Sequence, residues 1–484
     1  MSKDEYLITD APLKALTVFA MPMILGSFFQ QIYNMADSII VGQFVGSSAL
    51  AAVGACAALT NVFICVALGA GVGAGVLVSR YFGAREYGKM KTIVSTSLIS
   101  FLLLSIILGV FGFCFSHAMM SGLQTPADIL KEAVLYLRVY FVGFPFLFMY
   151  NILSTMFTSI GESKIPLGLL IFSSILNIIL DLLSIIVLKM GVAGAAWATV
   201  IAQAVSGFCC LGVIWKKFPI LHVQREEWQP DKLCILNLCN MGIPMGLQYS
   251  ITAIGSVIIQ AAVNSLGSVA VASVAAAVKI NMFLCCPYDA MGSTMATYAG
   301  QNVGASKFDR LKQGEKSCTL LGLVYGIAAF IFILLFGKYL ALLFVDASEK
   351  VIINQAHLFL MCNSAFYFSL ALVNIFRFTI QGMGFSRLAI LAGVCEMIGR
   401  TVVAFVFVPI FGYPAVCFAS PVAWILADCF LVPAFFFCVR SLEKRAALED
   451  RQAVLEDKQE DKSFGFERKF LGFETFFASV ASNI

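Results

Sequence analysis

The sequence predicts an all-α polytopic membrane protein with twelve transmembrane helices, arranged as two six-helix lobes related by a parallel internal repeat. Two observations carry this prediction. First, 60% of the 484 residues are hydrophobic, only 12% are charged, and the mean hydropathy is +0.90; no soluble domain of this length needs such a composition. Second, motifs of the first half return in the second half at a nearly constant offset.

Twelve apolar runs recur along the chain, separated by short polar breaks. Each is close to the length of about twenty residues that crosses a bilayer as a helix. An even number of spans places both termini on one side of the membrane. The runs are centred near Leu25, Ala67, Leu104, Phe146, Ile175, Gln203, Thr252, Leu284, Ala328, Tyr367, Ala392 and Leu426.

The internal repeat preserves spacing as well as residue type. Two glycines 37 residues apart (83 − 46) return with the same separation (304 − 267). Six spans copied after six spans keep their orientation, so the repeats are parallel, which is a transporter architecture. The matching positions are Pro22 with Pro244, Gly46 with Gly267, Gly83 with Gly304, Asn151 with Asn374, and Gly161 with Gly384.

The repeat and the charged breaks together predict the domain organisation. A connection rich in charge, HVQREEWQPDK, separates the halves because it would be costly in lipid. The predicted parts are an amino-terminal lobe (1–215), a cytoplasmic linker (216–236), a carboxyl-terminal lobe (237–440) and a charged cytoplasmic tail (441–484).

Basic residues predict the orientation, because Lys and Arg resist translocation. The even-numbered connections carry most of them, so both termini are expected in the cytoplasm, with the chain crossing the cell membrane many times. The basic residues concerned are Arg80, Arg85, Lys89, Lys91, Lys216, Lys217, Arg225, Lys232, Lys307, Arg310, Lys312 and Lys316.

Cysteine and histidine offer little chemistry. The fifteen Cys lie mostly within spans without a CxxC pair, and the three His stand alone without HExxH. We therefore expect neither a structural metal centre nor a cofactor, and no nucleic-acid partner. The expected partners are the lipid bilayer and small molecules, and the expected state is a monomer.

Two acids lie inside apolar runs of the first half, Asp37 and Asp181. A charge at bilayer mid-depth costs about 2.5–3.5 kcal/mol on insertion scales, so it is seldom left without a use. Asn177 lies four residues before Asp181 on the same helical face, and Thr199 offers a nearby hydroxyl. These oxygen ligands suit Na⁺, and a desolvated Asp pair equally suits one proton. The sequence leaves both ions open.

At several separated motifs the chain resembles the multidrug and toxic compound extrusion (MATE) family. They are the first-span Pro22 followed by Asp37 and VGQFVGSSALAAVG, the loops GAREYGKMK and QNVGASKFDRLK, and LNIILDLLSIIVLKMGVAGAAWATV from Leu176. The resemblance covers roughly residues 10–440. It implies a twelve-helix antiporter that uses a sodium or proton gradient to expel organic cations.

The resemblance also implies roles for individual residues. A cation site of the family's amino-terminal lobe is matched here by Asp37, Asn177, Asp181 and Thr199, and Asn151 matches a further polar position. Tyr33 and Gln30, one and two turns before Asp37, match substrate-contacting positions.

The second half departs from this pattern, because the counterpart of Asp37 is Ile259. The second half instead carries polar residues in or near its spans, and we expect them to form a structural or gating network. These residues are Lys279, Asp289, Arg377, Glu396 and Arg400. The seventh span offers Met245, Gln248 and Tyr249 to a chamber between the lobes, where aromatic and Met side chains suit lipophilic cations.

Two other functions remain to be weighed. A lipid-linked oligosaccharide flippase of the same superfamily would share the two-lobe plan but should have a more cationic chamber. An intramembrane enzyme would need a nucleophile with a base, or paired acids in a motif such as GxGD, and no such motif occurs.

Overall fold

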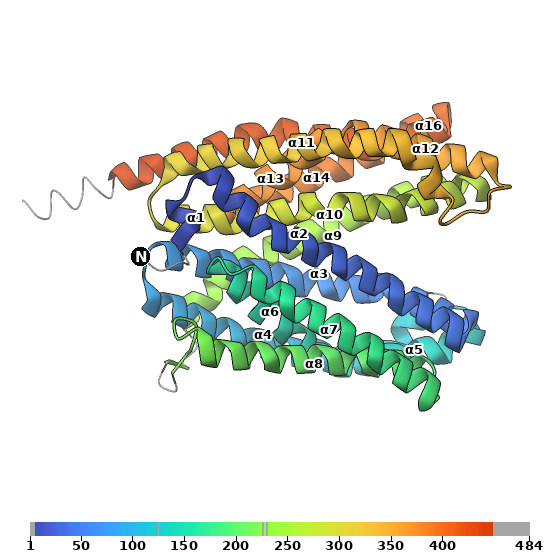
Figure 1. Ribbon diagram of the computed structural model, residues 1–484, viewed down its shortest axis with the longest axis horizontal. Coiled ribbons are helices and arrows are strands. Elements are labelled where there is room, and N and C mark those ends of the chain that lie inside the picture. The colour runs from blue at the N-terminus through green and yellow to red at the C-terminus, as the bar shows by residue number, and fades with distance from the viewer. Residues whose placement is uncertain (1–4, 124, 225–226, 229–230, 449–484) are drawn as a thin grey trace, which may run out of the picture. The chain divides into compact units, whose positions relative to one another are not determined.

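The computed structural model describes residues 5–123, 125–224, 227–228 and 231–448, and this part of the chain is helical almost throughout (Figure 1). Its internal contacts define two units, residues 1–435 and 436–484. The predicted amino-terminal lobe and residues 237–435 of the predicted carboxyl-terminal lobe belong to the first unit. The predicted tail, 441–484, lies outside the described residues from 449 onward.

The described residues contain ten helices long and apolar enough to cross a membrane, and two bent helix pairs bring the number of candidate spans to twelve. The prediction of an all-α fold with up to twelve spans is therefore confirmed. The first six spans are α2 (Pro12–Ile40) continued by the π-helix η2 (Val41–Val45), α3 (Ser47–Gly83), α4 (Tyr87–Gly122), α5 (Ala127–Val142) with α6 (Phe144–Ser159), α7 (Lys164–Leu182) continued by η3 (Leu183–Val187), and α8 (Val192–Lys217).

The second set of spans follows a connection of residues 218–231. Its members are α9 (Lys232–Ser265), α10 (Ser268–Gly304), α11 (Phe308–Ala341), α12 (Lys350–Ala365) with α13 (Tyr367–Gly382), α14 (Ser386–Val402) continued by η5 (Val403–Phe407) and α15 (Val408–Phe411), and a last helix, Ala419–Leu448, preceded by α16 (Tyr413–Cys417).

The backbone repeats with the offset that the sequence predicts. The fourth and tenth spans are the two bent pairs, with bends of 50° and 52°. Gly46 and Gly267 (offset 221) have φ of 119° and 95°, and Gly161 and Gly384 (offset 223) have φ of 98° and 92°. A positive φ is easily adopted only by glycine, so these four residues mark the same turns in both lobes.

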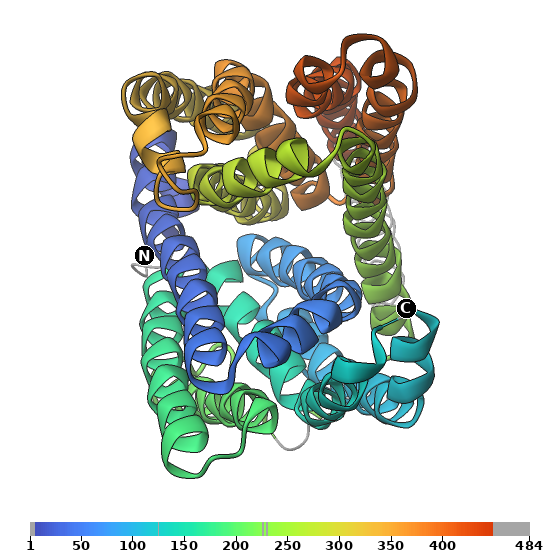
Figure 2. The same cartoon turned by 90° about the vertical axis from the view of Figure 1, so that its right-hand side faces the viewer.

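Two helices connect the lobes by packing on both of them. In the end view of Figure 2, α2 and α9 run along opposite sides of the molecule, between the blue-to-green and yellow-to-orange groups of helices. The helix α2 packs on α7 of its own lobe and on α10 and α11 of the other, and α9 packs on α14 and on α3. A change in the position of α2 would therefore alter helix packing in both lobes.

Glycines allow the lobes to approach closely. A Cβ added to Gly69 or Gly73 of α3 would lie 2.5 Å from the backbone nitrogen of Gly246 or 2.7 Å from that of Gly242, both on α9. Small residues at this spacing let membrane helices pack backbone to backbone. The contact between α3 and α9 thus depends on the absence of side chains.

The end of the bundle that holds the short helix α1 (Tyr6–Thr9), here called the closed end, repeats this arrangement symmetrically. A Cβ on Gly83 would lie 2.0 Å from the Gln301 carbonyl oxygen, and one on Gly304 would lie 1.9 Å from the Arg80 carbonyl oxygen. Both offsets equal 221 (304 − 83 and 301 − 80), so the repeats meet through equivalent surfaces.

The segment around α1 contacts both lobes at the closed end. Glu5 pairs with Arg85 at 2.7 Å, and the Tyr6 hydroxyl donates to the Gly161 carbonyl at 2.9 Å, both in the first lobe. In the second lobe, Arg310 donates to the carbonyls of Leu7 at 3.2 Å and Asp10 at 2.6 Å. The segment therefore ties the lobes together.

We predict that Gly304→Ala weakens the contact at the closed end, because the new methyl group would overlap the Arg80 carbonyl. Overpacking of this kind costs about 1–3 kcal/mol. The melting temperature of the purified protein in detergent should fall. Gly88→Ala, whose added Cβ meets open space, is the matched control; equal melting temperatures for the two variants would contradict the role of this contact.

Candidate functional site

The first lobe contains a compact cluster of polar side chains at the predicted cation site. The carboxyl groups of Asp37 on α2 and Asp181 on α7 lie within hydrogen-bonding reach of each other. Asp181 is fully buried and Asp37 is half-buried. On each of them Oδ1 is a buried oxygen without a hydrogen-bond partner among the described residues. Each acid therefore has an oxygen free to bind a ligand.

Neighbouring side chains complete this acid cluster. When the Asn177 amide is oriented to satisfy both of its ends, its nitrogen donates to Asp181 Oδ2 at 2.8 Å and its oxygen accepts from the Thr199 backbone N–H at 3.1 Å. The Tyr33 hydroxyl lies within hydrogen-bonding reach of the Thr199 hydroxyl and in the field of both acids. The cluster thus joins α2, α7 and α8.

Both acids immediately precede irregular helix. Asp37 lies four residues before η2 and Asp181 two residues before η3. Single π-turns of this kind occur often at functional sites, because they reposition the helix backbone. The second lobe has a π-turn, η5, at an offset of 220 (403 − 183) from η3. That offset pairs Asp181 with Thr401, so the second lobe lacks the acid.

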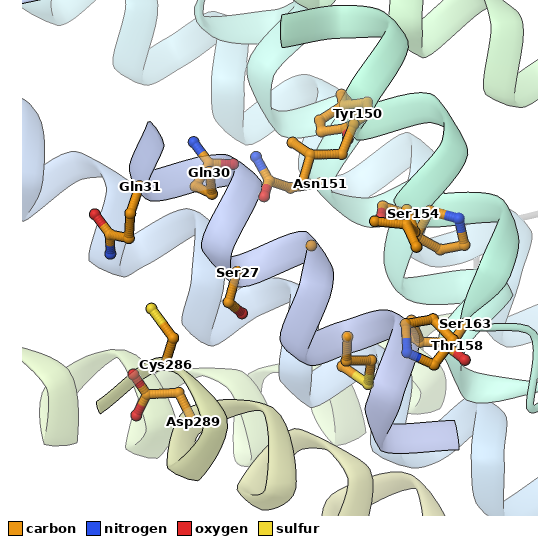
Figure 3. Close-up of a pocket in the computed structure, with 16 residues that line it drawn as sticks. Ser27, Gln30, Gln31, Tyr150, Asn151, Ser154, Thr158, Ser163, Cys286 and Asp289 are labelled. Carbon is orange, nitrogen blue, oxygen red and sulfur yellow. The ribbon is translucent and has the colours of Figure 1, made fainter. Parts of the chain in front are cut away.

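A cavity of about 320 Å³ lies between the lobes, here called the interlobe cavity (Figure 3). Gln30 and Asn151 point toward one another on its wall, and Gln31 lies opposite Cys286 and Asp289 of α10. Asp289 is exposed. Its lining residues are Pro22, Met23, Gly26, Ser27, Gln30, Gln31, Tyr150, Asn151, Ser154, Thr158, Ser163, Pro166, Leu167, Leu170, Cys286 and Asp289.

A second cavity, of about 230 Å³, adjoins the first and is here called the inner cavity. The two share Met23, Ser154 and Thr158. Its wall is formed by apolar and hydroxyl side chains of α2, α3, α6, α10 and α13. Asp289 is the one charged residue that lines either cavity within the described part of the chain.

The predicted polar residues of the second lobe separate into three places. Glu396 bridges two arginines, with Oε1 at 2.9 Å from Arg377 and Oε2 at 3.6 Å from Arg400. Arg400 also donates to the Thr252 carbonyl at 2.9 Å and so ties α14 to α9. Asp289 lines the interlobe cavity instead, and the exposed Lys279 lies 5.5 Å from the ring of Phe344, away from this group.

The seventh-span residues lie differently from the expected chamber wall. Met245 is fully buried in a small apolar cluster with Val76 and Met241, beside the contact between α3 and α9. Gln248 is also buried and accepts a hydrogen bond from Gln381 at 3.0 Å. Neither lines a described cavity, because the glycines of α9 bring this part of the helix against α3. Tyr249 is half-buried, in the field of Arg377 and Asp289.

The sequence analysis did not identify two further acids inside the second lobe, the half-buried Asp428 and the buried Glu315. Asp428 accepts a short hydrogen bond from the Ser369 hydroxyl, and it interrupts an apolar run just as Asp37 does, so the same rule could have identified it. Glu315 accepts from the Thr379 hydroxyl at 2.8 Å. Lysines at 312 and 316 surround it in the sequence, which makes it resemble an exposed loop residue.

Comparisons with known proteins agree with this architecture. The family model MatE matches residues 22–183 and 244–406, one stretch in each lobe. The chain is 29% identical over 348 residues to the "Probable multidrug resistance protein YpnP" of Bacillus subtilis, covering 72% of this chain and 77% of that protein. It is 27% identical to the "Multidrug export protein MepA" of Staphylococcus haemolyticus, covering 58% of this chain and 63% of that protein.

A solved structure shares the fold. It is described as the "Outward-facing conformation of a multidrug resistance MATE family transporter of the MOP superfamily", with a TM-score of 0.84 and 23% identity, covering 91% of this chain and 99% of that one. The family consists of transporters, which excludes the intramembrane enzyme considered above. The chain belongs to the MatE family of multidrug efflux transporters, multi-span proteins of the bacterial cell membrane.

Proposed function

We propose that the protein is a secondary active antiporter that exports organic cations in exchange for H⁺ or Na⁺, with Asp37 and Asp181 as the ion-coupling pair. The observation that carries the proposal is that the two carboxyl groups lie within hydrogen-bonding reach of each other. Two carboxylates within hydrogen-bonding reach of each other repel strongly unless a proton or a cation is shared between them. The pair is therefore suited to take up one such ion and release it again.

The composition of the cavities supports a cationic substrate. Asp289 supplies a negative charge at the interlobe cavity, and the amides of Gln30, Gln31 and Asn151 supply polar contacts. A pyrophosphate-linked lipid would need basic side chains at this place, and the described cavity walls contain none. Antiport of a cation is thus favoured over the flippase alternative.

The helix α2 supports a coupling between ion and substrate. It bears Asp37 at the acid cluster, and Gln30 and Gln31 about two turns earlier at the interlobe cavity. An ion that neutralises the acids changes how α2 packs on α7, and α2 also packs on α10 and α11. One net charge that moves inward down about 100 mV supplies about 2.3 kcal/mol, enough for about a 50-fold gradient.

We expect Asp37→Asn and Asp181→Asn each to abolish efflux driven by an ion gradient, because the one carboxyl group that remains beside an amide can no longer share a proton or Na⁺ with a second carboxylate. Extrusion of a fluorescent organic cation from loaded vesicles, with sodium and pH gradients imposed separately, measures this. The matched control is Asp309→Asn, which removes an exposed acid at the closed end. If both site variants are present at the same level as the native protein and show the same efflux, the proposed coupling pair is wrong.

The direction of transport depends on orientation, and we propose that the closed end faces the cytoplasm with both termini. Lys89, Lys91, Lys216 and Lys217 belong to this end, at the start of α4 and the end of α8. Basic residues favour the cytoplasmic side.

In a cysteine-free background, an impermeant thiol reagent should label a cysteine at Ser48 in intact cells and miss one at Lys89. Ser48 lies at the start of α3, opposite the closed end, and both positions are exposed. Lysed cells, where both positions should react, are the control. The reverse pattern in intact cells would overturn the orientation.

A further inference from the structure

A third cavity lies within the first lobe and shares no lining residue with the interlobe cavity or the inner cavity. Its volume is about 330 Å³. It is bounded by α4, α6, α8 and residues 221–223 and 228 of the connection that leads to the second lobe. The lining residues are Val94, Leu98, Leu153, Leu211, Gly212, Ile214, Trp215, Leu221, His222, Val223 and Trp228, and all except His222 are apolar or aromatic.

The connection forms a defined wall of this cavity. Leu221 and Val223 are buried in the core of the first lobe. Glu227 pairs with Lys91 of α4 at 3.4 Å and accepts from the Gln224 backbone N–H at 2.7 Å. The Gln224 N–H, followed by the Lys91 ammonium, holds the pKa of Glu227 below its usual value. Glu227 therefore stays ionised at neutral pH. The ion pair between Glu227 and Lys91 is lost only when the pH falls to the lowered pKa of Glu227.

The cavity adjoins the lipid-facing side of α8. Phe208, Leu211 and Trp215 are spaced by three and four residues, and their side chains are 66%, 41% and 72% exposed. Such an exposed apolar stripe on a membrane-spanning helix faces lipid tails. Leu211 and Trp215 belong both to this stripe and to the cavity wall, so the cavity is continuous with the lipid-facing surface.

Charge and aromatic residues place the cavity at the membrane interface. Trp215 and Trp228 line it, and tryptophan is enriched at the level of the lipid headgroups. The exposed Lys216 and Lys217 follow directly at the end of α8. Clustered basic residues at the end of a span attract anionic headgroups, each worth about 1 kcal/mol near the surface.

We propose that this cavity binds one acyl chain of an anionic phospholipid from the surrounding leaflet, with its headgroup at Lys216 and Lys217. An apolar cavity of this size offers water few hydrogen-bond partners, whereas a flexible hydrocarbon chain fills it by dispersion contacts. The bound lipid would stabilise the connection against α4 and α8. The connection leads directly into α9, whose first turn is capped by Asp231 through the Cys234 N–H at 3.2 Å.

Fluorescence of Trp228 tests the proposal in the full-length protein. Replacement of Trp197, Trp215 and Trp424 by Phe leaves Trp228 as the one tryptophan. In nanodiscs of phosphatidylcholine, a small fraction of phosphatidylglycerol with brominated acyl chains should quench Trp228. Brominated phosphatidylcholine at the same fraction should quench it several-fold less.

Gly212→Leu is the decisive variant, because a side chain at Gly212 enters open space in the cavity and meets no atom within 4 Å of its Cβ. It should reduce the quenching by brominated phosphatidylglycerol several-fold. Gly168→Leu, at an exposed glycine of α7 with equally open surroundings, is the matched control and should leave quenching unchanged. Equal quenching in the Gly212→Leu variant and the parent protein would overturn the site.

The headgroup part has its own test. The double variant Lys216→Gln with Lys217→Gln should remove the preference for the anionic lipid. The control is Lys338→Gln with Lys350→Gln, at the end of the bundle opposite the closed end, and it should keep that preference. A preference that survives the loss of Lys216 and Lys217, or equal quenching of the parent protein by both brominated lipids, would overturn the assignment to an anionic lipid.

Discussion

The rest of the structure depends on one electrostatic constraint: two carboxyl groups lie in contact inside a lobe built of apolar helices. Asp181 is fully buried, and each acid has an oxygen without a partner among the described residues. In water the repulsion between two such charges is small, but it rises steeply in a medium of low dielectric constant. Under the proposed function, the pair would reach a stable arrangement by sharing an ion, and the packing of α2 against α7 would then depend on whether that ion is present.

The helix packing links this local constraint to both lobes. The helix α2 crosses from the acid cluster past the interlobe cavity to α10 and α11, while α9 makes the equivalent crossing in the opposite sense. Glycines let α3 touch α9 and α10 through backbone atoms, so these contacts contain few side chains that must be repacked when the lobes move. Parallel repeats of this kind supply two equivalent halves, and under the proposed function the pair Asp37 and Asp181, which the second half lacks, would make the first half the one that responds to the ion.

Much of this arrangement was accessible from the sequence, and the reasons are physical. Glycines at 46, 161, 267 and 384 predicted the repeat because turns with φ from 92° to 119° strongly favour glycine in both copies. Asp37, Asn177, Asp181 and Thr199 could be grouped because polar residues are conspicuous in apolar runs. Helix rotation was not accessible: Tyr33 turns toward Thr199 and Gln31 toward α10, and Met245 turns into the contact with α3. The sequence places Asp289, Arg377 and Glu396 in spans, but it does not show that Asp289 lines a cavity or that Glu396 pairs with Arg377.

The most direct test of the central claim is a binding measurement without a membrane gradient. The affinity of the purified protein for a fluorescent organic cation is titrated in detergent across sodium concentration at fixed pH, and across pH without sodium. If the acid pair couples ion and substrate, affinity should fall as the coupling ion rises, because the two ligands are linked through α2. Asp37→Asn should make the affinity independent of that ion. The same ion dependence in the native protein and the variant would contradict the account, and would mean that Asp37 serves only the structure.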